Sequence, residues 1–374
     1  MALKQGRNYG IDLLRMVAMY MVCILHVLLH GGVLLESGGF SGQHLLSWFL
    51  EYGARCAVNL YALISGFVGI KSKYRVSNLA VLWLQVFLYS FGIAVAVLIV
   101  RPDFCSGSDL VGFAFPVLTK KYWYFSAYFC LFLFMPLLNA GINTLGKSSM
   151  RRTVIAMFLV FSVAASIAKQ TSHSPFSLNS GFSGLWLMIL YVLGAYIRKY
   201  GFWEKVPQPA LLGIWLGCTA ASLGIRITAE QIGIWLTGVA YNATVLLAYI
   251  SPLMVLGSVA LLLFFARLQC GNISKRIIAF FAPAAFGVYI IHMHPLIGDH
   301  LLYHRFSFIA DYSPFALVAA VILCAFGIYL ICSLIDLVRI QVFKLLKIKQ
   351  RCLALEEKLK RRVYDIETRT KLRH

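Results

Sequence analysis

The feature that most constrains this chain is its series of apolar runs of about 20 residues, each long enough to cross a bilayer as an α-helix. Of the 374 residues, 60% are hydrophobic and 13% are charged. Soluble domains carry about 25% charged residues, so a soluble core is excluded. The alternation of polar and apolar residues that marks a membrane β-barrel is missing from the sequence. The sequence therefore predicts an all-α, polytopic membrane helix bundle.

Ten apolar segments account for most of the chain: 9–29, 48–70, 77–100, 122–143, 153–168, 184–198, 209–225, 243–266, 277–297 and 313–335. Clusters of Lys and Arg follow every second segment, and Lys4 and Arg7 precede the first. The positive-inside rule then predicts that both termini lie in the cytoplasm. The formal net charge of +20 records this topology, and we expect no nucleic-acid partner.

The carboxyl-terminal stretch has a different composition from the rest. We expect residues 1–338 to form the membrane domain and residues 339–374 to form a basic cytoplasmic tail. Apolar residues recur in the tail at spacings of three and four, from Leu345 to Val363, which predicts an amphipathic helix. Its basic residues favour contact with the anionic lipids of the inner leaflet.

The first apolar segment carries three polar residues that are costly inside a membrane: Asp12, Arg15 and His26. Asp12 and Arg15 are three residues apart and are expected to pair. The eleven-residue step to His26 keeps it on the same helix face, roughly 16 Å further along the axis. A neutral imidazole there suits a general base for a hydroxyl group. The alternative is structural: a histidine bonded to a neighbouring helix, with the charged pair as an anchor at the cytoplasmic end.

The second segment contains Glu51 and Arg55, four residues apart and expected to pair. Its Ser65-Gly66 step predicts a close approach of two helices. Lys71, Lys73 and Arg75 follow at the cytoplasmic end. They are either a plain topology determinant or the binding site of a phosphate-rich cytoplasmic ligand.

Two later stretches combine aromatic and basic residues. The first contains Lys121, Trp123, Tyr124 and Tyr128, and is either an interfacial aromatic belt or a binding surface. The second ends in His292-Met-His294-Pro295, where the two histidines point about 200° apart on a helix. We expect no metal site there, and the nine scattered cysteines contain no CxxC pair.

These pieces, in this order, resemble acyltransferase family 3, the multi-pass membrane acyltransferases that modify surface polysaccharides and other envelope glycans. The family's opening pattern is a basic residue, then Asp-x-x-Arg, then ten residues and a histidine. Arg7, Asp12, Arg15 and His26 match it. The run from Val58 into Ser65-Gly66-Phe67, the basic cluster after it, the aromatic stretch and the Phe-Gly-x-Tyr-x-x-His-x-x-Pro stretch also resemble family segments. The resemblance covers residues 7 to about 300.

The resemblance implies an O-acyltransferase, with acetyl as the expected group. It would move the group from cytoplasmic acyl-CoA, a substrate rather than a bound cofactor, to a hydroxyl of an extracytoplasmic or lipid-linked glycan. His26 would act as the base or as a transient acyl carrier, with Arg15 orienting the donor and Asp12 fixing Arg15. The donor-side residues are then Lys71, Lys73, Arg75, Arg55 and Ser65, and the acceptor-side residues are Trp123, Tyr124, Tyr128, Lys121 and His292.

The competing class is a multi-pass exporter or flippase of a lipid-linked glycan. Such a protein also carries intramembrane charges. Here, however, the ionisable residues concentrate in the first two segments, and no inverted repeat is visible in the sequence. A polysaccharide polymerase is also disfavoured, because the longest external loops are too short for a catalytic domain.

Overall fold

The computed structural model describes residues 7–36, 41–169, 175–238 and 248–371, and within these ranges every regular element is a helix. Seven helical stretches are long and apolar enough to cross a membrane. They are α1 (Tyr9–Leu28), α5 (Val76–Val100), α7 (Trp123–Thr144), α8 with α9 (Lys147–Ala168), α11 (Gln208–Thr237), α13 with α14 (Asn272–His292) and α16 (Pro314–Leu345). The protein is therefore a multi-pass, all-helical membrane protein, as the sequence predicts.

Three further helical stretches correspond to predicted segments but are shorter or broken. α3 (Gly42–Arg55) and α4 (Ala57–Gly69) meet at Cys56, and α12 runs from Pro252 to Ala266. α10 (Gly184–Tyr200) meets a preceding turn at 79°, which gives eight candidate spans if the bent pair counts as one. The segment predicted at 243–266 begins outside the described residues. Each predicted segment thus contains a helix, while length and composition alone support seven or eight spans among the described residues.

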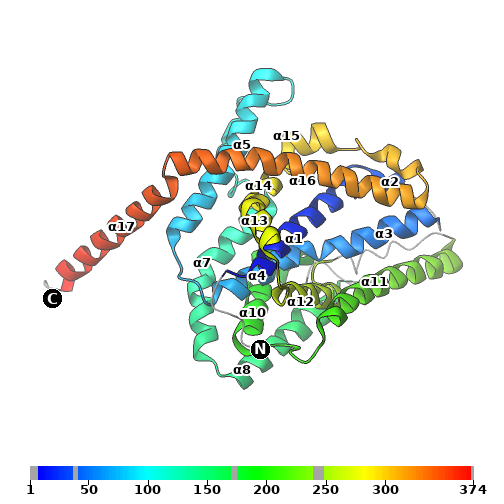
Figure 1. The fold of residues 1–374 in the computed structure, drawn as a ribbon, viewed down its shortest axis with the longest axis horizontal. Coiled ribbons are helices and arrows are strands. Elements are labelled where there is room, and N and C mark those ends of the chain that lie inside the picture. Colours follow the sequence, from blue (N-terminus) through cyan, green and yellow to red (C-terminus); the bar gives the residue numbers. More distant parts are fainter. Residues whose placement is uncertain (1–6, 37–40, 170–174, 239–247, 372–374) are drawn as a thin grey trace.

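Helix α1 lies at the centre of the bundle, where α3, α4, α12, α14 and α16 surround it (Figure 1). Its beginning is fixed by Asn8, whose side chain accepts a hydrogen bond from the Ile11 amide and donates one to the Ala266 carbonyl. The Asn8 cap satisfies one of the amides that a helix start leaves without a partner. As a result, 61% of the most apolar 18-residue window of α1 is buried inside the bundle.

Helices α4 and α10 cross at two glycines. A Cβ atom on Gly66 would lie 1.9 Å from the Tyr191 carbonyl oxygen, and one on Gly194 would lie 2.1 Å from the Leu63 carbonyl oxygen. The two backbones therefore touch directly, which is the close approach that the Ser65-Gly66 step predicts.

A buried polar cluster on α16, which the sequence did not predict, forms hydrogen bonds to α5 and packs against α14. Asp336 is fully buried and accepts hydrogen bonds from Tyr89, Gln85 and Arg339. On α14, Gly287 leaves room for the Asp336 carboxyl group, because a Cβ atom there would lie 2.1 Å from its Cγ atom. Asp336 therefore packs directly against the helix that carries His292.

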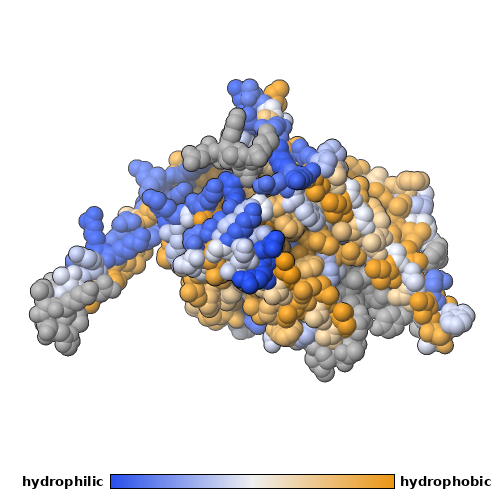
Figure 2. Space-filling model, turned by 90° about the horizontal axis from the view of Figure 1, so that it is seen from below, coloured by the Kyte–Doolittle hydropathy of each residue, from blue (hydrophilic) through white to orange (hydrophobic). Residues whose placement is uncertain are grey.

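The tail helix α17 (Ile348–Lys371) begins after a turn at Lys347, whereas α16 continues to Leu345. α17 leaves the bundle at an angle, and its described side chains are largely hydrophilic, in contrast to the broad apolar areas over the bundle (Figures 1 and 2). The Glu356 carboxylate accepts a hydrogen bond of 2.9 Å from the Ser77 amide. It thereby caps the start of α5, where Arg75 provides no side-chain cap.

Short helices complete the described chain: α2 (Val33–Glu36), α6 (Asp109–Ala114) and α15 (Pro295–Ile297). As the proline predicts, His294 leaves helical geometry, with φ −59° and ψ 128°.

Candidate active site

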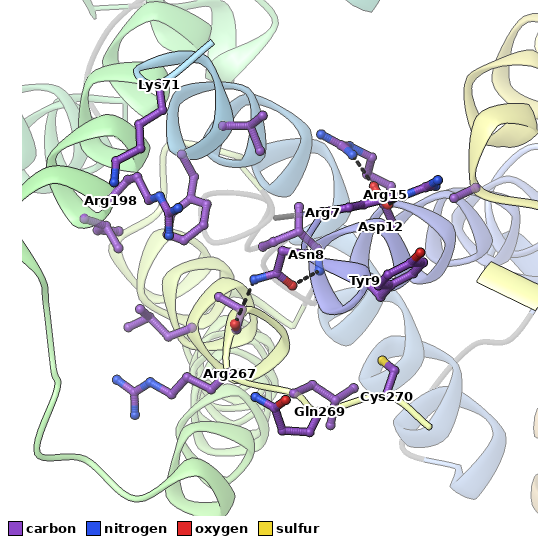
Figure 3. A pocket seen from close by; sticks show the side chains of 18 of the residues that line it. Arg7, Asn8, Tyr9, Asp12, Arg15, Lys71, Arg198, Arg267, Gln269 and Cys270 are labelled. Carbon is purple, nitrogen blue, oxygen red and sulfur yellow. Dashed lines mark hydrogen bonds and ion pairs between the residues drawn. The ribbon is translucent and has the colours of Figure 1, made fainter. Parts of the chain in front are cut away.

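A cavity of about 1550 Å³ opens where α1 begins. The start of α1 lines it together with the ends of α4, α10 and α12 and the segment that leads into and through α13 (Figure 3). Common small-molecule pockets measure about 300–1000 Å³, so this one admits a larger ligand. We refer to it below as the basic cavity.

The charge of the basic cavity is strongly positive. Its lining includes two acids, Asp12 and Glu204, and six bases: Arg7, Arg15, Lys71, Arg198, Arg267 and Lys275. Lys71 and Arg198 extend toward each other on one side, while Arg7 and Arg15 flank Asp12 on another (Figure 3). Cations gathered in one concave site raise the local concentration of anionic ligands.

Asp12 organises the start of α1, as its spacing from Arg15 predicts. It accepts hydrogen bonds from Arg15 (2.5 Å) and from Arg7 (2.6 Å), one on each carboxylate oxygen. The carboxylate is largely buried, whereas the side chains of Arg15 and Arg7 remain 33% and 47% exposed. Both guanidinium groups are therefore held in place and still reach the cavity.

The four remaining cavity cations have no carboxylate within ion-pair distance among the described residues: Lys71, Arg198, Arg267 and Lys275. The Arg198 guanidinium lies over the Phe67 ring, 5.1 Å from its centre. Arg267, by contrast, donates to the backbone carbonyls of Val206 and Trp203, which fixes the loop after α10.

The structure divides the predicted donor-side residues. Lys71 lines the basic cavity, whereas Lys73 and Arg75 are exposed on the same loop and lie outside its lining. Ser65 donates to the Tyr61 carbonyl within α4. From the sequence, the clusters containing Arg198, Arg267 and Lys275 were interpreted only as topology determinants. Their predicted position on the same side of the membrane as Lys71 was the signal that could have linked them to it.

A histidine pair lies further along α1. The Nδ1 atom of His26 is 2.8 Å from the Nε2 atom of His292, and the Nδ1 atom of His292 is 2.5 Å from the Val288 carbonyl oxygen. His292 is 1% exposed, whereas His26 is partly exposed. The structure thus brings His292, predicted on the acceptor side, into direct contact with His26.

The Val288 carbonyl sets the proton positions of this pair. A carbonyl oxygen only accepts, so the Nδ1 atom of neutral His292 carries the proton and its Nε2 atom accepts from His26. His26 therefore carries its own proton on Nδ1, and its Nε2 atom is left as an acceptor. That atom has no hydrogen-bond partner among the described residues. In many catalytic sites, a hydrogen bond from one ring nitrogen of a histidine likewise decides that the other ring nitrogen is unprotonated.

Arg55 lies on the His26 side, away from the basic cavity. It pairs with Glu51, as their spacing predicts, and its guanidinium lies 5.3 Å from the centre of the Tyr249 ring. Its charge also acts on His26 electrostatically. Arg55, predicted among the donor-side residues, therefore lies within electrostatic range of the candidate base and not in the lining of the basic cavity.

Aromatic side chains fill the space between the two ends of the site. Tyr61 donates to the Arg15 carbonyl, its ring contacts that of Tyr124, and Tyr124 contacts Tyr289 one helical turn before His292. Tyr128 lies within electrostatic range of Arg15. These tyrosines connect the basic cavity to the histidine pair.

The two remaining residues predicted on the acceptor side, Trp123 and Lys121, lie in different clusters. Trp123 belongs to a cluster with Phe182 and Tyr249, at centre distances of 4.5 and 6.1 Å. Lys121 instead lies over the Phe113 ring at 4.3 Å. Within the described part of the chain, no group of three His, Cys, Asp or Glu side chains could hold a metal ion.

The fold and the site together define a multi-pass membrane protein with a basic cavity at one end of a central helix and an oriented histidine near its other end. The family model described as an acyltransferase domain matches residues 8–335. The chain belongs to acyltransferase family 3 and is a membrane acyltransferase. No curated protein and no solved structure matches the chain.

Proposed function

We propose that the protein is an O-acyltransferase that moves an acetyl group from cytoplasmic acetyl-CoA to a hydroxyl of an extracytoplasmic or lipid-linked envelope glycan. One observation carries the proposal: a single helix begins in the basic cavity and presents the open Nε2 atom of His26 about 16 Å beyond Arg15. Family membership supplies the reaction class, acyl transfer.

The donor end of the proposal rests on charge. Coenzyme A carries a diphosphate and a further phosphate, and charge-assisted hydrogen bonds from Lys and Arg are the strongest that proteins offer such groups. Lys71 and Arg198 extend toward one another without a carboxylate partner among the described residues. They are the proposed phosphate ligands, with Arg15 nearest the thioester arm.

The chemical step assigns a proton to each stage. His26 Nε2 accepts the proton of the sugar hydroxyl while its oxygen attacks the thioester carbonyl carbon. When the tetrahedral intermediate collapses, the carbon–sulfur bond breaks and the CoA thiolate takes the same proton from His26. Arg55 lies near enough to act on His26 electrostatically, and we assign it to the developing oxyanion. A His26-bound acyl group is the alternative path.

The proposal carries a topology. The ten predicted segments place the basic cavity in the cytoplasm, where acyl-CoA occurs, and His26 toward the opposite face, where envelope glycans are modified. Both termini are then cytoplasmic and the membrane is the inner cell membrane. No cofactor is needed beyond the acyl-CoA substrate.

A charge-matched pair of double variants tests the donor site. Lys71→Ala with Arg198→Ala removes two charges from the basic cavity, and Lys73→Ala with Arg75→Ala removes two from the loop beside it. In nanodiscs, we expect the first pair to raise the Kd for acetyl-CoA at least tenfold, since a charged hydrogen bond contributes about 1.5–3 kcal/mol. We expect the second pair to change it less than threefold. Equal weakening by both pairs would reject the cavity as the donor site.

Glycan analysis separates an enzyme from an exporter. Deletion of the protein should leave the glycan present but without its ester groups. Loss of the whole polymer from the cell surface would instead support the exporter and contradict an acyltransferase role. The path through His26 is tested by rapid quenching with labelled acetyl-CoA: label that stays on wild-type protein and is absent from His26→Gln would identify the acyl carrier.

A further inference from the structure

A second polar site lies between α3 and α11, which run side by side (Figure 1). One face of α3 carries five side chains with polar atoms: His44, Trp48, Glu51, Tyr52 and Arg55. Successive helical turns contribute them at spacings of three or four residues, so they form one stripe along the helix. The stripe begins at His44, near the start of α3, and ends at Arg55, whose charge acts on His26 electrostatically.

Helix α11 adds two charged residues to this stripe. The Arg226 guanidinium lies 3.5 Å from the centre of the Trp48 ring and pairs with Glu230 at 2.5 Å. Glu230 also lies 3.4 Å from His44. Arg226 and Glu230 are 6% and 8% exposed, so both charges are withdrawn from solvent.

Several polar atoms of the stripe have no hydrogen-bond partner of good geometry within the part of the chain that the structure describes. They are Nε and NH1 of Arg226, Nε1 of Trp48, the hydroxyl of Tyr52 and Oε2 of Glu51. Such atoms are rare in proteins because each loses its hydrogen bonds to water without replacement. Here they gather in one place between two helices, on a stripe that ends at Arg55, which indicates a ligand that supplies the missing partners.

The set of unpartnered atoms identifies the chemistry of that ligand. Three are N–H donors, one is a carboxylate acceptor, and the Tyr52 hydroxyl does both. A hydroxyl group donates and accepts at once, so a molecule with several hydroxyls satisfies this mixed set. A simple anion would satisfy the donors and oppose Glu51 and Glu230.

The aromatic cluster of Trp123, Phe182 and Tyr249 lies at the end of the stripe that Arg55 forms, because the Arg55 guanidinium lies over the Tyr249 ring. Its faces can stack on the apolar face of a sugar ring. We propose that the α3–α11 stripe is the acceptor site, in which the sugar ring bonds to Arg226, Trp48 and Tyr52 while its reactive hydroxyl reaches His26. This inference rests on the proposed function and adds the location of the acceptor.

Two conservative variants test the site, because each removes a polar atom that has no hydrogen-bond partner of good geometry among the described residues. Trp48→Phe deletes the indole N–H, and Tyr52→Phe deletes the hydroxyl. Neither variant loses a hydrogen bond of good geometry to another described residue, so thermal stability should stay the same or rise. Tyr329→Phe is the matched control, since its buried hydroxyl is also unpartnered but belongs to α16.

The assay uses labelled acetyl-CoA, protein in nanodiscs and two acceptor probes with one aromatic group: 4-nitrophenyl glucoside, and 2-(4-nitrophenoxy)ethanol, which has a hydroxyl but no sugar ring. We expect Trp48→Phe and Tyr52→Phe each to raise the KM for the glucoside about tenfold, the loss of one hydrogen bond of about 1.4 kcal/mol. The KM for acetyl-CoA, the KM for the alcohol and all values of Tyr329→Phe should not change.

The outcomes separate this inference from the proposed function. An unchanged glucoside KM in both variants, or an equal rise for both probes, would overturn the acceptor site while leaving the acyltransferase intact. Wild-type transfer to the alcohol but not to the glucoside would overturn the sugar-binding stripe. An absence of transfer to either probe, with acetyl-CoA bound, would count against the proposed function itself and against the inference with it.

Discussion

The hydrogen bond between His26 and His292 gives the sharpest prediction, because His292 contacts the candidate base directly. His292→Phe keeps a ring of similar size and removes the Nε2 acceptor. In the reaction His26 becomes positively charged, and a hydrogen bond to a charged group contributes about 1.5–3 kcal/mol. The kcat should therefore fall roughly 10- to 150-fold, at 1.36 kcal/mol for each factor of ten.

A second variant separates this effect from damage to the fold. The side-chain oxygen of His292→Gln can still accept from the Nδ1 atom of His26, so this variant should recover most of the lost kcat. Transfer of labelled acetyl in nanodiscs gives kcat, and the Kd for acetyl-CoA, expected to be unchanged in both variants, reports on folding. A kcat for His292→Phe within twofold of wild type, with His26→Ala inactive, would refute the oriented pair.

Three further predictions concern the fold. Gly66→Ala should lower the thermal midpoint in detergent, because its methyl group meets the Tyr191 backbone at a cost of about 1–3 kcal/mol; an unchanged midpoint would contradict the direct α4–α10 contact. Asp336→Leu should destabilise by about 3–5 kcal/mol, since Arg339 would stay buried without its partner, and denaturant unfolding would measure it. Bonds from Lys360 and from Ser77 lower the pKa of Glu356 to about 2. Its stabilising contribution is therefore complete above about pH 4.3 and is lost as the pH falls toward 2. Hydrogen exchange at the Ser77 amide should speed up over that range, and also in Glu356→Ala at pH 7; equal exchange in the variant would disprove the cap.

Much of the fold could be predicted from the sequence because membranes restrict the choices. Apolar runs near helix length fixed the positions of the helices, and the spacing rules for Asp12 with Arg15 and Glu51 with Arg55 correctly predicted two ion pairs. Both rules depend only on neighbours along the chain.

Contacts between distant segments were beyond such rules. Nothing local links His26 to His292 or Asp336 to Tyr89, because those pairs depend on how whole helices pack. The basic clusters were visible as a topology pattern, yet which of their members reach the cavity depends on the direction of each side chain. Hence Lys71 and Arg198 line it, while Lys73 and Arg75 point elsewhere.

The orphaned atoms of Arg226, Trp48 and Tyr52 could not be found from the sequence at all. Arg226 and Glu230 lie beyond the predicted segment end at residue 225, whereas α11 continues as a helix to Thr237. Only the packing of α11 on α3 shows that their charges are buried against an aromatic ring.

The central claim is that His26 carries out acyl transfer while a separate cavity binds the donor. The most direct measurement compares wild type and His26→Ala in nanodiscs, with labelled acetyl-CoA as donor and glycan extracted from the cell envelope as acceptor. We predict that His26→Ala binds acetyl-CoA with wild-type Kd and transfers no label to the glycan. Transfer at the wild-type rate by His26→Ala would contradict the account.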